Sequence, residues 1–127
     1  QLYTVPGQVY YQTTRRLVLQ GADGVVFVAD SQARQLDENI ESFQDLHANL
    51  AEHAVDARTI PLVIQYNKQD LPRDLILDAE ALSDAINFRG VPEFPADALH
   101  GPGVFETLRG ISELVLKRLS AGSAAGR

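Results

Sequence analysis

Four consecutive residues after an apolar run carry side chains suited to recognising a guanine base. They are Asn67, Lys68, Gln69 and Asp70, and they follow the run "LVIQY". A carboxylate at Asp70 can accept hydrogen bonds from the guanine N1–H and 2-amino groups, which adenine does not offer in that arrangement. The Asn67 amide can interact with the N7/O6 side of the base and tie neighbouring loops together, and the Lys68 stem can lie along the ring face. The alternative is a polar exit from a strand that binds no ligand.

A second segment, Ala96–Val104 ("ADALHGPGV"), has features that could complete such a site. It lies after the last expected strand and before the last expected helix. Backbone N–H groups near Ala98 and Leu99 can donate to the guanine O6, which again distinguishes guanine from adenine. His100 lies in the same loop; it could contact a nucleotide, but the favoured interpretation is a residue without that role. Because small residues and glycines often precede a helix, the alternative is a flexible connection without a ligand.

Short apolar runs predict the strands that position these loops. Gly24–Asp30 ("GVVFVAD") and Pro61–Asn67 ("PLVIQYN") are rich in β-branched residues and are bounded by Gly, Pro, Asp or Asn. This pattern is typical of central strands in a parallel sheet with both faces covered. The segment Pro92–Asp97 predicts a strand of only a few residues because of its prolines. The opening residues "QLYTV" are compatible with the end of a further strand.

Apolar residues at spacings of three and four predict three amphipathic helices. Their apolar positions are Leu36, Ile40, Phe43, Leu46 and Leu50 in the first, Ala79, Leu82, Ala85 and Ile86 in the second, and Phe105, Leu108, Ile111, Val115 and Leu119 in the third. We expect Asp78 to cap the second helix, a weaker helix at Tyr10–Leu19 and a flexible tail at 121–127. The alternation of strands and helices predicts an α/β domain with a mostly parallel sheet, in which ligands bind at the carboxyl ends of the strands.

The composition argues against several classes of function. The chain has 127 residues, of which 45% are hydrophobic and 22% are charged, and its formal net charge is −6. Binding to nucleic acid through neutralised phosphates is therefore not expected. The absence of cysteine excludes a disulfide framework and a thiolate metal site. No apolar run reaches the roughly 18 residues of a membrane span and no secretory signal is present, so the default location is the cytoplasm.

The order of three short motifs resembles that of the Ras-like small GTPases. "TVPGQ" comes first, at Thr4–Gln8, "NKQD" follows at Asn67–Asp70, and "ADAL" precedes the last helix. The stretch "LYTVPGQVYY" is similar to the bacterial MglA (mutual gliding protein) subfamily, which controls cell polarity and motility. The resemblance implies that residues 1–120 are the C-terminal portion of one G domain, from its third strand onward. The implied fold is the three-layer α/β fold of the P-loop NTPases.

The resemblance also implies roles for individual residues. Thr4 to Gly7 fall on the D-x-x-G motif of switch II, with Gly7 at the glycine that meets the γ-phosphate, and Gln8 falls on the catalytic glutamine that orients the attacking water. "NKQD" falls on the base-specificity motif, and "DAL" falls on the S-A-K loop with only its backbone contacts kept. The implied nucleotide-binding residues are Gly7, Asn67, Lys68, Asp70, Ala98 and Leu99.

Thr4 departs from the wider family, which has an aspartate at that position. The aspartate supports the Mg²⁺ shell with a negative charge, usually through water, whereas a hydroxyl can hold a water but cannot supply the charge. We therefore expect weaker magnesium binding. Within the MglA-like group a threonine is expected here, and no residue of this chain is assigned as a metal ligand.

The phosphate-binding loop of such proteins, G-x-x-x-x-G-K-[ST], does not occur in this sequence, and neither does a switch I segment. In the family's order both come before the position of Gln1. Because the sequence also contains no methionine, we expect it to be part of a longer GTPase. The missing part would supply the phosphate loop and the principal Mg²⁺ ligands for bound GTP or GDP.

Three classes of function stay open on the sequence. The first is a GTPase switch that hydrolyses GTP, for which the resemblance implies a roadblock-type activating protein (MglB-like) and motility or polarity effectors as partners. The second is a protein-interaction module that keeps the fold without hydrolysis. The third is a phospho-accepting receiver domain that uses Asp30, although the acidic pair that it needs is not found. We expect His47 and His53 to be structural, and Tyr10 and Tyr11 to be core residues or partner anchors.

Overall fold

Strands and helices alternate along the part of the chain that the computed structural model describes, residues 22–52 and 59–125, with side chains up to Ala121. The elements are β1 (Val25–Asp30), the 3₁₀ helix η2 (Ala33–Gln35), α2 (Leu36–Glu52), β2 (Leu62–Asn67), α3 (Ala79–Ile86), β3 (Glu93–Pro95) and α4 (Val104–Ala125). The three predicted strands and the three predicted amphipathic helices of this region are confirmed. The expected first strand and the helix at Tyr10–Leu19 lie outside the described residues.

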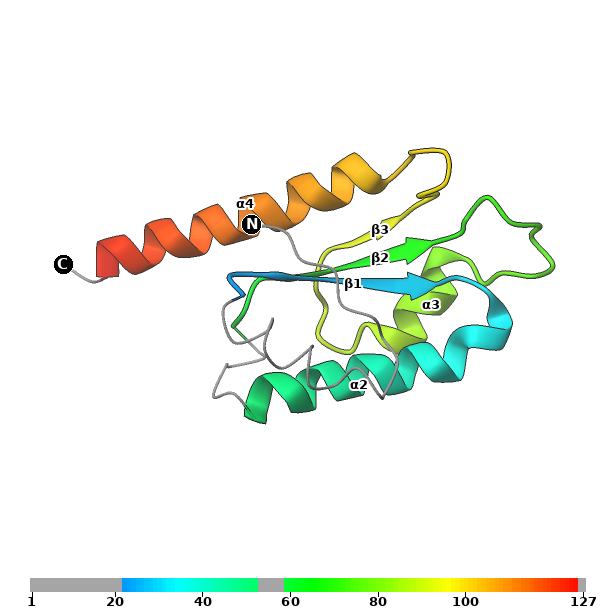
Figure 1. Cartoon of the computed structure of the whole chain (residues 1–127), viewed down its shortest axis with the longest axis horizontal. Helices are drawn as coiled ribbons and strands as arrows, with labels where there is room; N and C mark the ends of the chain where they lie inside the picture. Colours follow the sequence, from blue (N-terminus) through cyan, green and yellow to red (C-terminus); the bar gives the residue numbers. More distant parts are fainter. Residues whose placement is uncertain (1–21, 53–58, 126–127) are drawn as a thin grey trace.

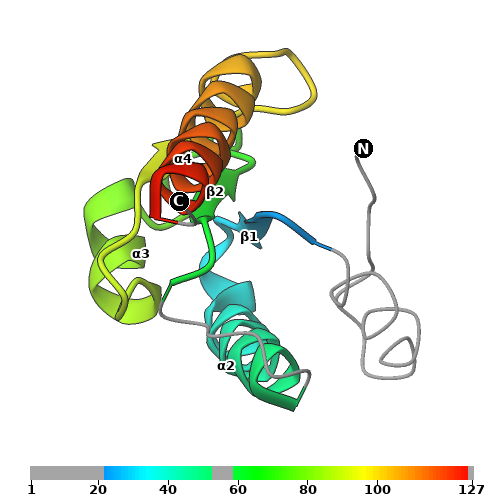
Figure 2. The same ribbon diagram turned by 90° about the vertical axis from the view of Figure 1, so that its left-hand side faces the viewer.

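The described strands form one parallel sheet in the order β1-β2-β3. In this register the last residues of β1 and β2, Asp30 and Asn67, lie opposite each other, and Tyr66 lies opposite Pro95 of β3. Figures 1 and 2 show α2 and α3 on one face of the sheet and α4 on the other, which makes three layers. The predicted α/β class and parallel sheet are confirmed.

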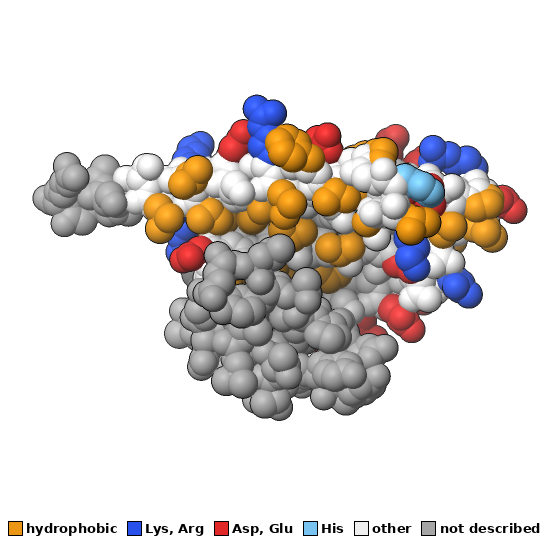
Figure 3. All heavy atoms as spheres, turned by 45° about the horizontal axis from the view of Figure 1, so that its top comes forward, with side chains coloured by type: hydrophobic (Ala, Val, Ile, Leu, Met, Phe, Trp, Pro, Cys, Tyr) orange, Lys and Arg blue, Asp and Glu red, His pale blue; other side chains and the backbone are white. Residues whose placement is uncertain are grey.

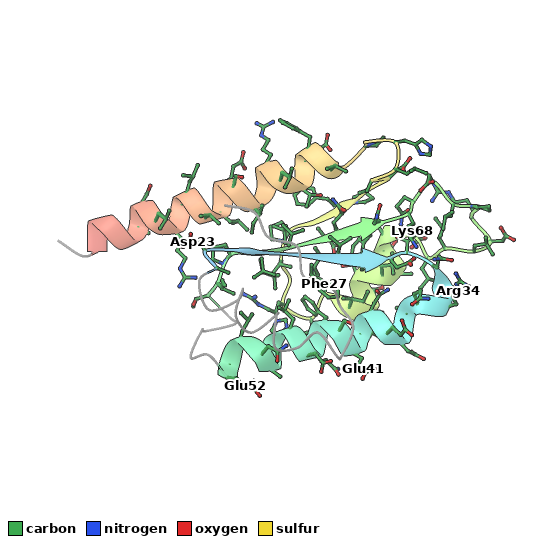
Figure 4. All side chains as sticks on the ribbon, in the orientation of Figure 1. Asp23, Phe27, Arg34, Glu41, Glu52 and Lys68 are labelled. Carbon is green, nitrogen blue, oxygen red and sulfur yellow. The ribbon has the colours of Figure 1, made fainter. Side chains whose placement is uncertain are left out.

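The main core lies between the sheet and the two helices α2 and α3. Its buried members are Ala29, Phe43, Leu46, Leu50, Ile60, Leu62, Ile64, Tyr66, Leu82 and Ile86. Phe27 points from β1 towards α2 (Figure 4) and meets the Phe43 ring edge-to-face at a centroid distance of 4.9 Å. Burying a large apolar side chain stabilises the fold by about 1.5–3 kcal/mol. The apolar stripe of α2 is therefore the principal anchor of this layer.

The first turn of α3 is capped as the sequence predicts. The Asp78 carboxylate accepts a hydrogen bond from the Ala81 amide at 2.9 Å, which satisfies one of the amide groups that a helix start leaves without a partner. At the other end of the chain, α4 continues to Ala125. The helix thus includes most of the segment 121–127 that was expected to be a tail, because small residues without apolar periodicity are still compatible with helical backbone.

The face of α4 that contacts the sheet matches the predicted apolar stripe only in part, since Ile111 and Val115 of that stripe lie against Gly24. Phe105 and Leu119 belong to that stripe but are 69% and 55% exposed, whereas Thr107 is buried and Gly110 packs closely on the Phe94 ring of β3. Small residues let the helix backbone approach the sheet, and this close approach turns the larger apolar side chains outward. Figure 3 shows hydrophobic side chains along the outer surface of α4.

Gln65 supplies a polar contact between β2 and α4. Its Nε2 donates to the Thr107 Oγ1 at 2.8 Å, and the Thr107 hydroxyl donates to the Gly103 carbonyl oxygen at 2.6 Å. Both side chains are buried, so the chain of bonds satisfies groups that would otherwise be costly to remove from water. No helix within residues 22–52 and 59–125 is long and apolar enough to cross a membrane.

Candidate nucleotide site

The carboxyl ends of the three described strands meet at one edge of the sheet. β1 ends at Asp30 and β2 at Asn67, which are in register, and the loop after β3 begins beside them because the Ala96 amide donates to the Tyr66 carbonyl oxygen at 2.8 Å. Figure 1 shows the loops after β2 and β3 at this end, and Figure 4 places Lys68 there, opposite the end that carries Asp23. Ligands of open parallel sheets bind at this edge, so the predicted base-binding residues stand where such a ligand would bind.

Lys68 forms an ion pair with Asp30 across the ends of β2 and β1. The Lys68 Nζ lies 2.9 Å from Asp30 Oδ2, and Gln32 donates to the same carboxylate from its backbone amide (3.0 Å) and its side chain. Burial raises the pKa of Asp30, but the hydrogen bonds from Gln32 and the charge of Lys68 outweigh it and hold the pKa below its ordinary value. Asp30, the alternative phospho-acceptor, is therefore a fully engaged structural carboxylate.

The backbone of Lys68 is in the left-handed region, with a φ of 70°. This conformation is unfavourable for a residue other than glycine, and it persists where surrounding bonds fix it. The neighbouring amides supply such bonds, since the Gln69 N–H donates to the Ala96 carbonyl oxygen at 3.0 Å and the Leu71 N–H donates to the Lys68 carbonyl oxygen at 3.2 Å. The "NKQD" turn is thus held in one shape by the adjacent loop.

Asn39 of α2 positions the end of β1, a role that the sequence analysis did not identify. Its Nδ2 donates to the Asp30 carbonyl oxygen at 2.8 Å, and its Oδ1 accepts from the Asp30 amide at 3.2 Å. The Asn39 side chain is buried. Among the described strands β1 pairs only with β2, and Asn39 supplies hydrogen bonds to the Asp30 backbone on the side where no described strand pairs with it. Nothing in its spacing distinguishes Asn39 from a solvated residue beside the apolar stripe, so no sequence signal could have found it.

Gln69, the variable position of the "NKQD" motif, also has a structural role that sequence reasoning missed. Its Nε2 donates to the hydroxyl of the buried Ser31 at 2.7 Å. The backbone of the same region is joined by the bond from the Leu77 amide to the Ser31 carbonyl oxygen at 2.9 Å. The loop after β2 is thereby attached to the connection between β1 and α2.

Asn67 ties the two loops together, as the sequence analysis anticipated. Its Oδ1 accepts a hydrogen bond from the Ala98 amide at 2.9 Å. The Ala98 N–H, which was expected to donate to a guanine O6, therefore donates to Asn67 in this structure. Leu99, the other backbone donor expected there, is exposed, and the loop is closed by the bond from the Gly101 amide to the Asp97 carbonyl oxygen at 2.7 Å.

Asp70 lies next to two residues of the β3–α4 loop, Asp97 and His100. The ligand atoms of these three side chains all lie within 4.8 Å of one another. Mg²⁺ prefers an octahedral shell of oxygen atoms, and a group that contains a histidine and lies on the base side of the site does not fit it. Within the described ranges, the Asp70 carboxylate forms an ion-pair contact with His100, at 3.8 Å from Nδ1 to Oδ2. Because this distance is longer than a hydrogen bond, Asp70 can still accept hydrogen bonds from a base.

The predicted catalytic side of the site is not placed. Thr4, Gly7 and Gln8 lie outside the described residues. The structure brings together Asn67, Lys68 and Asp70 with the loop that contains Ala98 and Leu99, and their roles towards a ligand stay a prediction.

Comparison with known proteins gives an independent indication of family. No protein-family model matches the chain. The chain is 51% identical over 121 residues to the mutual gliding-motility protein MglA of Myxococcus xanthus (strain DK1622), and the match covers 95% of this chain and 61% of that protein. The chain thus spans less than two thirds of its relative's length. The match agrees with the parallel α/β architecture and with the motif order noted above. Over the part that it spans, the chain is similar to the MglA group of Ras-like small GTPases.

Proposed function

We propose that this chain forms the base-binding part of a small GTPase switch that binds GTP or GDP and hydrolyses GTP. The observation that carries the proposal is the placement of Asn67, Lys68 and Asp70 at the carboxyl ends of β1 and β2, in a turn fixed by the adjacent loop. Such a turn presents a carboxylate, an amide and an aliphatic stem towards one base. By analogy with its relative, the protein would act in the cytoplasm in bacterial cell polarity and gliding motility.

The chemistry of the described residues favours guanine over adenine. The two oxygens of Asp70 can accept one hydrogen bond each from N1–H and the 2-amino group. Lys68 is held at its Nζ by Asp30, and its aliphatic stem can offer an apolar surface to one face of the ring. The residues present therefore fit a guanine nucleotide. The phosphate groups need donors that are not among these residues.

Hydrolysis is assigned to Gln8, with Gly7 beside the γ-phosphate. Mg²⁺, when bound, neutralises charge on the phosphate groups, and Thr4 would support its water shell only weakly. A roadblock-type activating protein (MglB-like) and motility effectors are the partners that this proposal includes. Their recognition would depend on the switch II segment "TVPGQVYY".

The nucleotide carried by the full-length protein tests base recognition. The purified protein would be heat-denatured and the released nucleotide identified by chromatography. We expect GDP or GTP. Release of adenine nucleotides, or no binding of added GDP to the nucleotide-free protein, would contradict the proposal.

The variant Gln8→Leu tests the hydrolytic step. We expect GTP turnover to fall by at least about tenfold, which corresponds to a barrier higher by about 1.4 kcal/mol, with GDP affinity nearly unchanged. Single-turnover assays with and without an activating partner would measure it. Unchanged turnover would remove Gln8 from catalysis, and binding without turnover in the unmodified protein would favour the interaction-module alternative.

A further inference from the structure

His100 contacts the carboxylate that is proposed to read guanine. Its Nδ1 lies 2.5 Å from Asp97 Oδ2 and 3.8 Å from Asp70 Oδ2. The His100 backbone amide also donates to Asp97 Oδ1 at 3.0 Å. Both oxygens of Asp97 thus hold His100, and they fix the ring nitrogen between two carboxylates that come from the loops after β2 and β3.

Two other basic side chains at this edge are engaged elsewhere. Lys68 pairs with Asp30, and the Arg73 guanidinium reaches the Gln69 side-chain oxygen at 3.5 Å. Among the residues that the structure describes, the carboxylates that form ion-pair contacts with the His100 ring are those of Asp97 and Asp70. The His100 side chain is 62% exposed, so solvent reaches the ring.

We propose that His100 is a specificity-determining residue that adjusts how strongly Asp70 reads guanine, an inference that rests on the proposed function. A neutral His100 donates its Nδ1–H to Asp97 and leaves both Asp70 oxygens to the base. An imidazolium is attracted to Asp70 Oδ2 and competes for it with the guanine 2-amino or N1–H group. Guanine needs both oxygens of Asp70, whereas hypoxanthine has no 2-amino group and needs only one. Acid therefore weakens the preference for guanine over hypoxanthine.

The ratio of GDP affinity to IDP affinity isolates this effect. The two nucleotides share their phosphates, so protonation of the phosphates and loss of fold change both affinities alike. Between about pH 8 and about pH 5.5, the range in which histidine side chains titrate, we expect the ratio for the full-length protein to fall about two- to fivefold, the range for an exposed ion pair.

Two variants carry the test. In His100→Gln we expect a ratio that does not change with pH. In the control His47→Gln, in α2, we expect the fall seen in the unmodified protein. If His100→Gln does not fold, Asp97→Asn serves instead, because it keeps an oxygen for the His100 amide but removes the charge that holds the ring; there we expect a smaller fall.

The outcomes separate this inference from the proposed function. An unmodified protein that binds neither nucleotide at about pH 8 would overturn the proposed function. An unmodified protein that binds GDP normally but shows the same pH profile as His100→Gln would overturn only the role of His100. Competition of GDP and IDP against a fluorescent guanine nucleotide measures each affinity.

Discussion

The hydroxyl of Tyr66 provides a sharp test of how the end of β2 is held. Tyr66 is fully buried and directly precedes Asn67, and its hydroxyl donates to Glu93 Oε2 at 2.6 Å. The same oxygen accepts from Asn87 Nδ2 at 2.8 Å. The change Tyr66→Phe removes the hydroxyl and leaves the ring in the core, so no large cavity forms.

The expected loss follows from the kind of bond that is removed. A hydrogen bond to a charged group contributes about 1.5–3 kcal/mol. Glu93 is only partly buried and keeps Asn87 as a donor, so water can replace part of the lost bond. We therefore expect Tyr66→Phe to lower the free energy of unfolding at neutral pH by about 1.5 kcal/mol, the lower end of that range.

The loss should depend on pH in a defined direction. Burial raises the pKa of Glu93, but the hydrogen bonds from Tyr66 and Asn87 outweigh it and hold the pKa below the ordinary value of 4.5. A folded-state pKa below the unfolded one gives stability that is present above pH 4.5 and is lost as the pH falls through the folded value. The difference between Tyr66→Phe and the unmodified protein should therefore shrink in acid.

The alkaline side gives a second signature. Burial, and then the hydrogen bond and charge of Glu93, raise the pKa of Tyr66 above its ordinary value of 10.0. A raised folded-state pKa gives stability that is complete below pH 10 and is lost as the pH rises above it. Above pH 10 the unmodified protein should therefore lose this contribution to its stability. Tyr66→Phe should show no such loss, because it has no phenol at that position to ionise.

Urea unfolding of the full-length protein, followed by circular dichroism, measures these differences at about pH 3.5, 7 and 10.5. These values lie on either side of the ordinary ranges for glutamate and tyrosine. Glu93→Gln and the double variant complete a mutant cycle that isolates the pair. An equal loss at all three pH values would refute the charged hydrogen bond as its source.

Two further stability predictions concern the contacts of α4. Gly103→Ala should lower the free energy of unfolding by about 2 kcal/mol or more, because Gly103 has a φ of 85° and a Cβ there would overlap the Pro95 carbonyl oxygen. The control Gly90→Ala, with positive φ but open space around it, should lower it less in the same urea assay. An equal loss in the two variants would contradict the steric argument. Thr107→Val should lower the free energy of unfolding by about 1–3 kcal/mol, because it leaves the buried Gln65 amide without its acceptor. Adding Gln65→Leu should recover part of that loss in urea unfolding, and a double variant whose loss is the sum of the two single losses would contradict this explanation.

Local patterns were sufficient to predict the described elements. The runs of β1 and β2 are short, rich in β-branched residues and bounded by turn residues, and the apolar stripe of α2 has helical spacing. Asp78 has the side chain of a helix cap. The position of the "NKQD" turn followed from the same reasoning, since a parallel sheet collects the loops after its strands at one edge.

The features that the sequence did not reveal depend on tertiary contacts. The clamp of Asn39 on Asp30, the bond from Gln69 to Ser31 and the packing of Gly110 on Phe94 join residues from different elements. None of them has a local signature. For the same reason the sheet-contacting face of α4 was predicted only in part. Ile111 and Val115 of the predicted stripe lie against Gly24, whereas apolarity indicated Phe105 and close packing selected Thr107.

The base preference of Asp70→Asn tests the central claim most directly. An amide in place of the Asp70 carboxylate loses one acceptor for guanine but can donate to the 2-oxo group of xanthine. We predict that GDP affinity of the full-length protein falls at least about tenfold, as for a lost hydrogen bond to a charged group, while XDP affinity rises. Asp74→Asn, an exposed aspartate of the same loop, should leave both affinities unchanged. A ratio of GDP to XDP affinity that is the same in Asp70→Asn as in the unmodified protein would contradict the assignment of Asp70 as the residue that reads guanine.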